Sequence, residues 1–225
     1  MKAAAASIAL VLALLVCGAA LAENYHFART KPGDGLAASL TLRKADLPAQ
    51  LKLFGGRTAP DESPNNESCQ GYTPKEHDLV VVGDAATSYR NSDRSVFVDS
   101  QVQVFKSTAM AATDVARGIR TLTPACQAEE AKQDHAKLVS FVVLGRPKCT
   151  CDMALSFMFE TKTSHPGLDN LEIVSAIRKG RIEAAIFTTV GKTTTDVQKA
   201  QAAGQTALIV QGLALKSALK RLHAQ

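Results

Sequence analysis

The sequence predicts an α+β domain in which an antiparallel sheet of about six strands packs against one or two helices. Two observations support this class. Several segments alternate apolar and polar residues at a spacing of two, the period of a strand with one buried face, and they do not alternate with helices as a parallel sheet requires. One long segment near the C-terminus instead repeats its leucines at helical spacing.

These patterns place the elements along the chain. We expect strands over 78–91 and 94–105, a helix over 107–122, a polar helix over 127–137, strands over 138–145 and 153–162, a hairpin over 171–191 and a helical segment over 193–222. Lys179-Gly180 supplies the turn of the hairpin, and Gly204 is a point at which the last segment can divide into two helices. Residues 55–77 are rich in Gly, Pro, Asn and Ser, which predicts a long surface loop.

The first 22 residues have the features of a signal peptide. Lys2 supplies a positive start, an apolar run from Ala3 to Val16 follows, and Ala20-Leu21-Ala22 matches the small-x-small pattern that signal peptidases cut. A retained membrane anchor is the alternative, but the apolar run breaks into Gly and Ala before a polar segment. We therefore expect cleavage near Ala22 and one extracytoplasmic domain over residues 23–225, either secreted or held at the cell surface.

Charge and motifs argue against several classes of function. The formal net charge of +5 falls to +4 without Lys2, and the charges are spread along the chain, so the sequence predicts no nucleic-acid partner and no membrane span in the mature domain. The sequence has no Gly-x-Ser-x-Gly elbow, phosphate loop or His-Glu-x-x-His helix, and its histidines are scattered. We accordingly predict no catalytic residues, no cofactor and no metal site.

Four cysteines remain after the leader, namely Cys69, Cys126, Cys149 and Cys151, and an even number in an exported chain indicates disulfides. If Cys149 and Cys151 begin a strand, their Cβ atoms lie about 6.5–7 Å apart, whereas a disulfide needs about 3.5–4.5 Å. We therefore predict that each joins one of Cys69 and Cys126. The pairing of Cys69 with Cys126 and of Cys149 with Cys151 stays an alternative, as do a redox pair and a metal clip.

Three stretches and the loop cysteine Cys69 carry a resemblance to known proteins. The stretches are "LTLRKADLPAQL", "SVFVDSQVQVFKSTAMAATDVARGI" leading to Cys126, and "RIEAAIFTTVG" followed by "ALKRL". They resemble a broad group of actinobacterial secreted proteins and lipoproteins, which is similar to the extracellular sensor domain of the mycobacterial Ser/Thr kinase PknH. The resemblance implies a disulfide-stapled α+β sandwich with a cleft and an unidentified ligand. The chain departs from the group in having Ala49-Gln50-Leu51 where Gly-Trp is common, and in its Cys-Thr-Cys pair.

The function we expect is that of a non-enzymatic, extracytoplasmic, sensor-like domain that binds a small ligand or a surface partner in a cleft between sheet and helix. Phe157, Phe159 and Leu208 are the residues we expect to line this cleft. The alternatives are a thiol–disulfide oxidoreductase that uses Cys149 and Cys151, and a structural protein of the envelope. Asn66-Glu67-Ser68 also matches a glycosylation sequon.

Overall fold

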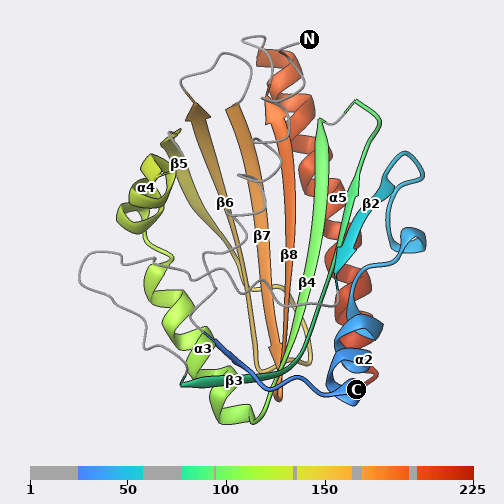
Figure 1. Ribbon diagram of the computed structural model, residues 1–225. Helices are drawn as coiled ribbons and strands as arrows, with labels where there is room; N and C mark the ends of the chain where they lie inside the picture. Colours follow the sequence, from blue (N-terminus) through green and yellow to red (C-terminus); the bar gives the residue numbers. More distant parts are fainter. Residues whose placement is uncertain (1–24, 58–77, 94, 134–135, 164–168, 193–196) are drawn as a thin grey trace, which may run out of the picture.

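The computed structural model describes residues 25–57, 78–93, 95–133, 136–163, 169–192 and 197–225. The predicted signal peptide, Cys69 and the Asn66 sequon lie outside these residues. The described chain forms a large mixed sheet with helices on both of its faces, as Figure 1 shows. The predicted α+β class is confirmed, and the sheet is larger than the predicted six strands.

Eight strands make up the described sheet. In chain order they are β1 (Tyr25–Phe27), β2 (Lys52–Arg57), β3 (Leu79–Arg90), β4 (Val96–Phe105), β5 (Ala136–Gly145), β6 (Met153–Thr163), β7 (Asp169–Lys179) and β8 (Ile182–Lys192). Their order across the sheet is β1-β3-β4-β8-β7-β6-β5, and β2 also pairs with β3. All pairings are antiparallel except that of β1 with β3. The predicted hairpin is β7–β8, and Gly180 turns it with φ +58°.

The helices are α2 (Lys31–Leu40), the 3-10 turn η2 (Lys44–Asp46), α3 (Thr108–Thr121), α4 (Pro124–Gln133) and α5 (Val197–His223). In Figure 1, α5 runs behind the sheet, and α3 lies in front of its lower left part. The last helix continues through Gly204 and is not divided at this residue. None of the helices that the structure describes is long and apolar enough to cross a membrane.

The main core lies between α5 and one face of the sheet. Small residues of α5, including Ala207, Ala214 and Ala218, are almost fully buried and let the helix approach the strands closely. Gln211 is the polar residue at this contact. Its side chain accepts a hydrogen bond from Thr188 Oγ1 (2.6 Å) and donates to Ser175 Oγ (2.8 Å), which fixes the position of α5 along the sheet.

The N-terminal segment is more ordered than the sequence suggested. The elements expected from the sequence begin only at residue 78, but α2 already covers Lys31–Leu40, and its N-cap Thr30 accepts a hydrogen bond from the Gly33 amide (3.0 Å). Gly33 and Gly83 place the helix backbone directly on β3, because a Cβ on either residue would lie 2.1 Å from a backbone atom of the other segment. Gly33-Asp34-Gly35 made this helix hard to predict from the sequence, because glycine disfavours helices in general.

On the opposite face of the sheet, the described residues form two separate apolar clusters. One lies under the first half of α3 and contains Tyr25, Leu79, Val81, Phe105 and Ala111. The other lies on β6, β7 and β8 and contains Phe157, Phe159, Val174 and Phe187. The space between these two clusters holds the candidate site.

A candidate binding cleft between α3 and the sheet

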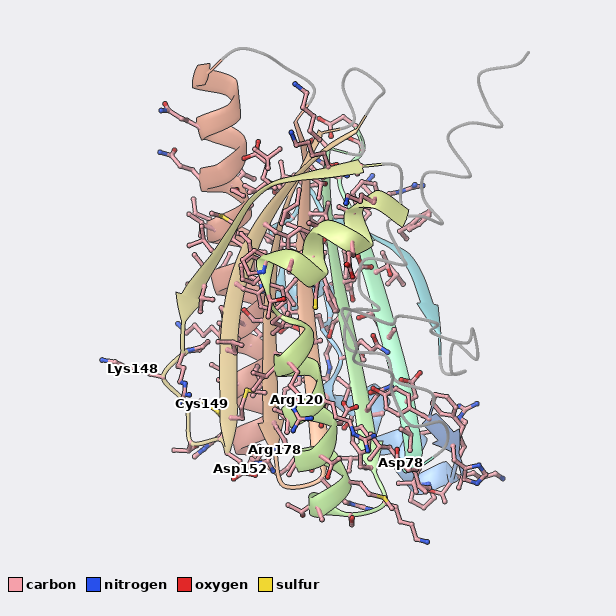
Figure 2. The ribbon with its side chains drawn as sticks, turned by 90° about the vertical axis from the view of Figure 1, so that its left-hand side faces the viewer. Asp78, Arg120, Lys148, Cys149, Asp152 and Arg178 are labelled. Atoms are coloured by element: carbon pink, nitrogen blue, oxygen red, sulfur yellow. A yellow bond between two sulfur atoms is a disulfide. The ribbon has the colours of Figure 1, made fainter. Side chains whose placement is uncertain are left out.

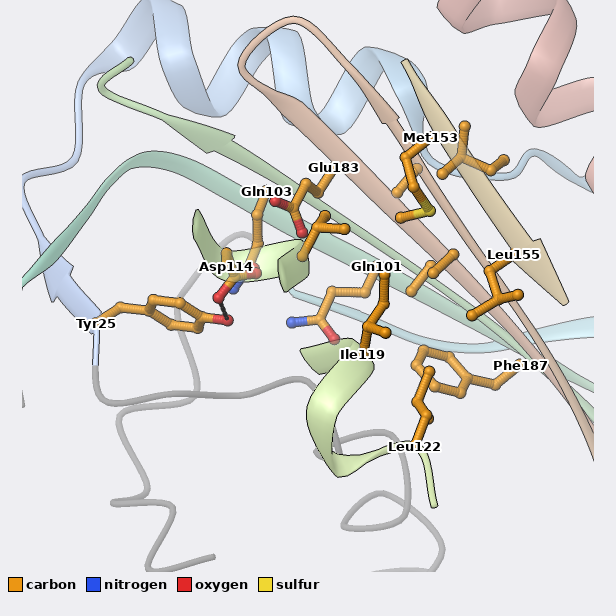
Figure 3. Close-up of a pocket in the computed structure, with 15 residues that line it drawn as sticks. Tyr25, Gln101, Gln103, Asp114, Ile119, Leu122, Met153, Leu155, Glu183 and Phe187 are labelled. Atoms are coloured by element: carbon orange, nitrogen blue, oxygen red, sulfur yellow. Dashed lines mark hydrogen bonds between the residues drawn. The ribbon is translucent and has the colours of Figure 1, made fainter. Parts of the chain in front are cut away.

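A narrow cleft separates the second half of α3 from strands β4, β8, β7 and β6. Figure 3 shows the residues that line it. Its volume is about 40 Å³. Most of the lining side chains come from α3 and from strand positions two residues apart, such as Gln101 and Gln103, because every second strand residue points to this face. The cleft lies between sheet and helix as expected, but the helix is α3 and not α5, to which the expected lining residue Leu208 belongs.

Two alanines at the bottom of the cleft create the hollow. Ala176 on β7 and Ala185 on β8 are paired across the two strands, and both line the cleft. Their neighbours on the same face of the sheet are much larger, as Phe187 on β8 and Val174 on β7 show. A pair of methyl side chains among larger ones leaves a depression that α3 covers only in part.

One end of the cleft is polar. The hydroxyl of Tyr25 donates a hydrogen bond to Oδ1 of Asp114 (3.0 Å), and the two residues are 7% and 3% exposed. Gln103 and Glu183 lie opposite each other on β4 and β8. Gln101, two residues before Gln103 on β4, points to the same face. Figure 3 shows these side chains gathered on one side of the site. A ligand group that forms hydrogen bonds would find both donors and acceptors here.

The other end of the cleft is apolar. Ile119 and Leu122 come from the last turn of α3 and its C-cap, and Met153, Leu155 and Phe187 come from the sheet. Ile119 is 46% exposed, an unusual value for a large aliphatic side chain beside a cleft. This end therefore presents apolar surface at the entrance of the site.

Asp99 lies on the same face of the sheet, outside the cleft. It is paired with Ser88 on β3 and with Phe187 on β8. Burial raises the pKa of its carboxyl group to about 6, and a hydrogen bond with Ser88 opposes part of this rise. The protein thus places a carboxyl group with a raised pKa two residues from cleft residue Gln101.

The predicted lining residues do not meet at this cleft. Phe157 and Phe159 are buried in the aromatic cluster, where Phe157 stacks on Phe141 with ring centroids 5.8 Å apart. Leu208 belongs to α5, on the other side of the sheet, and is 52% exposed. None of the three lines the cleft. Spacing along the sequence identified inward-facing residues, but it did not tell which face of the sheet α5 covers.

The predicted pairing of Cys149 and Cys151 is wrong. These two cysteines form a disulfide with each other, and their Cα atoms are 5.2 Å apart. A Cβ separation of about 6.5–7 Å requires that the strand begin at Cys149, whereas β6 begins at Met153 and both cysteines lie in the preceding turn. Cys126, on α4, is disulfide-bonded as well. The alternative pairing is correct for Cys149 and Cys151.

The turn that contains this disulfide is fixed to its surroundings. Asp152 accepts hydrogen bonds from the Gly180 amide (2.7 Å) and from Arg178 (3.1 Å), and Thr150 Oγ1 lies 2.6 Å from Nδ1 of His223 at the end of α5. Figure 2 shows Asp152 and Arg178 together, with Lys148 pointing away from the protein. The turn is therefore a rigid bridge between the sheet and the C-terminal end of α5.

The described residues contain no group of three or more His, Cys, Asp or Glu side chains that could hold a metal ion. Cys149 and Cys151 are bonded to each other, so this described turn does not have the free thiolates that a metal clip requires.

No protein-family model and no curated protein match the chain. Solved structures do match. The extracellular domain of PknH from Mycobacterium tuberculosis is 13% identical, with a TM-score of 0.50 over 85% of this chain and 97% of that one. The chain shares its fold. A putative uncharacterized protein (Rv0999 ortholog) from Mycobacterium smegmatis matches at 11% identity and a TM-score of 0.40, over 80% of this chain and 98% of that one.

Sequence reasoning missed the polar residues of the cleft. Asp114 and Gln103 were assigned to a helix and a strand, but nothing marked them as members of a site. The available signal was an acidic residue on the inward side of a helix, because Asp114 follows the buried Ala111 at a spacing of three. Helical spacing fits a buried stripe of Ala109, Ala112 and Ala116 equally well, yet all three are exposed in the structure.

Proposed function

We propose that this chain is a non-enzymatic, extracytoplasmic, sensor-like domain that binds a small amphipathic molecule in the cleft between α3 and the sheet. The observation that supports it most is the division of the cleft into an apolar entrance and a polar inner end. A fold shared with the extracellular domain of PknH agrees with a domain outside the cytoplasm.

The chemistry of the lining selects the class of ligand. Ile119, Leu155 and Phe187 suit an apolar body, which gains roughly 25 cal/mol for each Å² of apolar surface removed from water. Asp114 and Gln103 at the far end suit a hydrogen-bonding group, above all one that donates, such as an amine or a hydroxyl. A molecule with an apolar body and one such group would fit in a single orientation.

The size of the cleft suggests how binding produces a response. A volume of about 40 Å³ holds only a few waters, because one water needs about 10–15 Å³ measured in the same way. A larger ligand therefore requires the end of α3 to move outward. The middle of the helix is anchored by the Tyr25–Asp114 hydrogen bond and by the ion pair of Arg117 with Asp78, whereas Ile119 and Leu122 lie beyond these anchors.

Movement at the end of α3 reaches α4 directly. The two helices are separated by Leu122 and Thr123, and α4 carries the disulfide-bonded Cys126 and packs beside β5. Binding in the cleft would thus shift α4 relative to the edge of the sheet. This shift is the response that we assign to the sensor-like domain.

A fluorescence titration tests the proposal with N-phenyl-1-naphthylamine, a neutral apolar probe that becomes bright in apolar sites. Ala185→Leu fills the floor of the cleft without changing a polar group, and we expect it to abolish the fluorescence increase seen with the wild type. Ala112→Leu is the matched control, since it adds the same atoms on the exposed side of α3. If folded A185L binds the probe as the wild type does, the cleft is not the binding site.

The Cys149–Cys151 disulfide supports a second candidate, thiol–disulfide exchange. Both cysteines are half-buried in the turn that precedes β6, and their bond is one that the thiolate of a partner can attack in an exchange reaction. In such a reaction a partner dithiol becomes a disulfide, and its two electrons and two protons pass to Cys149 and Cys151. Oxidation of a reduced dithiol peptide by the wild type, but not by C149S/C151S, would favour this function. Equal rates would exclude it.

A further inference from the structure

The last helix has an unusual charge pattern. The 27 residues of α5 contain Lys199, Lys216, Lys220 and Arg221 but no Asp or Glu, in a chain that has 21 acidic residues. Arg221 is engaged in an ion pair with Asp46 of η2. Lys216 and Lys220 are exposed and lie one turn apart, on the side of the helix that faces away from the sheet.

The same helix exposes large apolar side chains one to two turns before these lysines. Leu208 is 52% exposed, Ile209 64% and Leu213 44%. These three side chains are not part of the core, because α5 contacts the sheet through Ala207, Val210, Ala214 and their neighbours. Three exposed aliphatic residues within six positions form a patch rather than isolated surface residues.

A groove lies beside this patch. It has a volume of about 520 Å³ and lies between the second half of α5 and the turn Pro147–Thr150. Leu215 and Leu219 line it together with Lys148, Lys216 and Lys220. The hydrogen-bonding contact of Thr150 with His223 holds the turn against the helix, so Lys148 keeps its place beside the other two lysines. In Figure 2, Lys148 points outward from this turn.

We propose that the outer side of α5 and the Pro147–Thr150 turn dock on the surface of an anionic lipid bilayer. Leu208, Ile209 and Leu213 would enter the boundary between headgroups and acyl chains, as the apolar residues of interfacial helices do. Lys148, Lys216 and Lys220 would contact the lipid phosphates. The domain is then held flat against a membrane by α5, with the cleft on the opposite face of the sheet facing away from it.

The charge pattern favours a bilayer over the other occupants. A second copy docked through the same surface would bring these lysines toward each other, which costs free energy rather than gaining it. A protein interface of this kind would more commonly offer Tyr, Trp or an unpaired Arg, and the α5 sequence has no aromatic residue. Exposed aliphatic residues beside lysines match the two parts of an anionic lipid surface.

Vesicle co-sedimentation tests the proposal. The full mature chain is mixed with vesicles of phosphatidylglycerol and phosphatidylcholine in equal amounts, and with vesicles of phosphatidylcholine alone. We expect binding to the first and little to the second. Since each lysine near such a surface contributes about a factor of five to ten, K148Q/K216Q/K220Q should weaken binding by about a hundredfold or more. I209S/L213S should also weaken it, with less effect on its salt dependence.

The matched control is K106Q/K132Q/K137Q, which removes three exposed lysines from other elements and changes the net charge equally. It should bind nearly as the wild type does. Equal losses of binding in both triple variants would overturn the proposal, because binding would then depend on net charge alone. Absence of wild-type binding to the phosphatidylglycerol vesicles would also overturn it. A dimer in sedimentation velocity that I209S/L213S disrupts would identify a second copy as the occupant. A185L should bind vesicles normally, which separates this surface from the cleft.

Discussion

Tyr25 Oη and Asp114 Oδ1, 89 residues apart in sequence, are joined by a 3.0 Å hydrogen bond that closes the polar end of the cleft. The bond links the first strand to the middle of α3 and thereby sets how closely this helix approaches the sheet. Tyr25 also packs edge-to-face against Phe105, with ring centroids 5.8 Å apart. The aromatic ring and the hydroxyl group of this residue thus have separable roles.

Tyr25→Phe isolates the hydroxyl. The ring contacts remain, but the buried Asp114 carboxylate loses one donor, so we expect the free energy of unfolding to fall by about 1–3 kcal/mol in urea titrations. Tyr89→Phe is the matched control, because the Tyr89 hydroxyl donates a buried hydrogen bond to Leu42 O (3.0 Å) far from the cleft. Both variants should lose stability, and only Y25F should alter binding of the naphthylamine probe. Identical binding in both would show that the bond does not shape the cleft.

Asp99 should make the wild type less stable as pH rises. Its pKa is about 6 in the folded chain and 3.8 in the reference state, so the folded protein binds more protons between these values and loses stability as pH increases through them. Two pK units correspond to about 3 kcal/mol, an upper limit because Asp99 is not fully shielded from water. Asp99→Asn should remove this dependence, so that its advantage over the wild type is present at pH 7.5 and vanishes near pH 4.

Asp93 provides a control of opposite sign. Hydrogen bonds from the Ser95 amide (3.0 Å) and hydroxyl (2.8 Å) lower the pKa of its carboxyl group. Its contribution is present at neutral pH and is lost as pH falls through the lowered pKa. Asp93→Asn should therefore be less stable than the wild type at pH 7, and the difference should shrink in acid. If D99N and D93N respond to pH in the same direction, the assignment for Asp99 fails.

The Cys149–Cys151 disulfide should contribute little stability. The chain-entropy model assigns about 4 kcal/mol to a crosslink that closes a loop of 50 or more residues, but only about 1–2 kcal/mol to one that joins residues two apart. We expect the free energy of unfolding of C149S/C151S to be about 1–2 kcal/mol below that of the wild type in urea titrations without reductant. A loss near 4 kcal/mol would mean that the turn supports the end of α5 through more than this one bond.

Most strands of the sheet could be predicted from the sequence, because the alternation of apolar and polar residues that marks a strand lies within the strand itself. Met153, Leu155, Phe157 and Phe159 share a face as their spacing of two requires, and the β7–β8 hairpin turns at Gly180. The site was less predictable because it depends on which face each helix covers. Leu208 and Phe157 both belong to apolar patterns, yet they lie on opposite sides of the sheet. The Cys149–Cys151 disulfide was only the alternative pairing because the strand was expected to begin at Cys149, whereas β6 begins at Met153.

The close packing of α2 on β3 allows a further test of the N-terminal fold, a region in which the sequence did not predict a helix. A Cβ on Gly83 would lie 2.1 Å from the carbonyl carbon of Gly33 and 2.2 Å from its carbonyl oxygen. Both are backbone atoms, so neither can rotate away as a side chain could. Gly83→Ala must therefore push α2 off the strand, and we expect the free energy of unfolding to fall by about 1–3 kcal/mol in urea or thermal unfolding. The shift would also break the bond from the Asp84 amide to Asp34 Oδ1 (3.3 Å).

Gly35→Ala is the matched control for this substitution. It lies on the same helix with nothing within 4 Å of its new Cβ, and it replaces a glycine in a helix interior. We expect it to raise the free energy of unfolding by about 0.5–1 kcal/mol, because alanine loses less conformational entropy when the helix forms. Opposite signs for these two glycine-to-alanine changes would establish that α2 is a helix whose backbone rests on Gly83. A destabilised G35A would instead indicate that residues 31–40 do not form this helix.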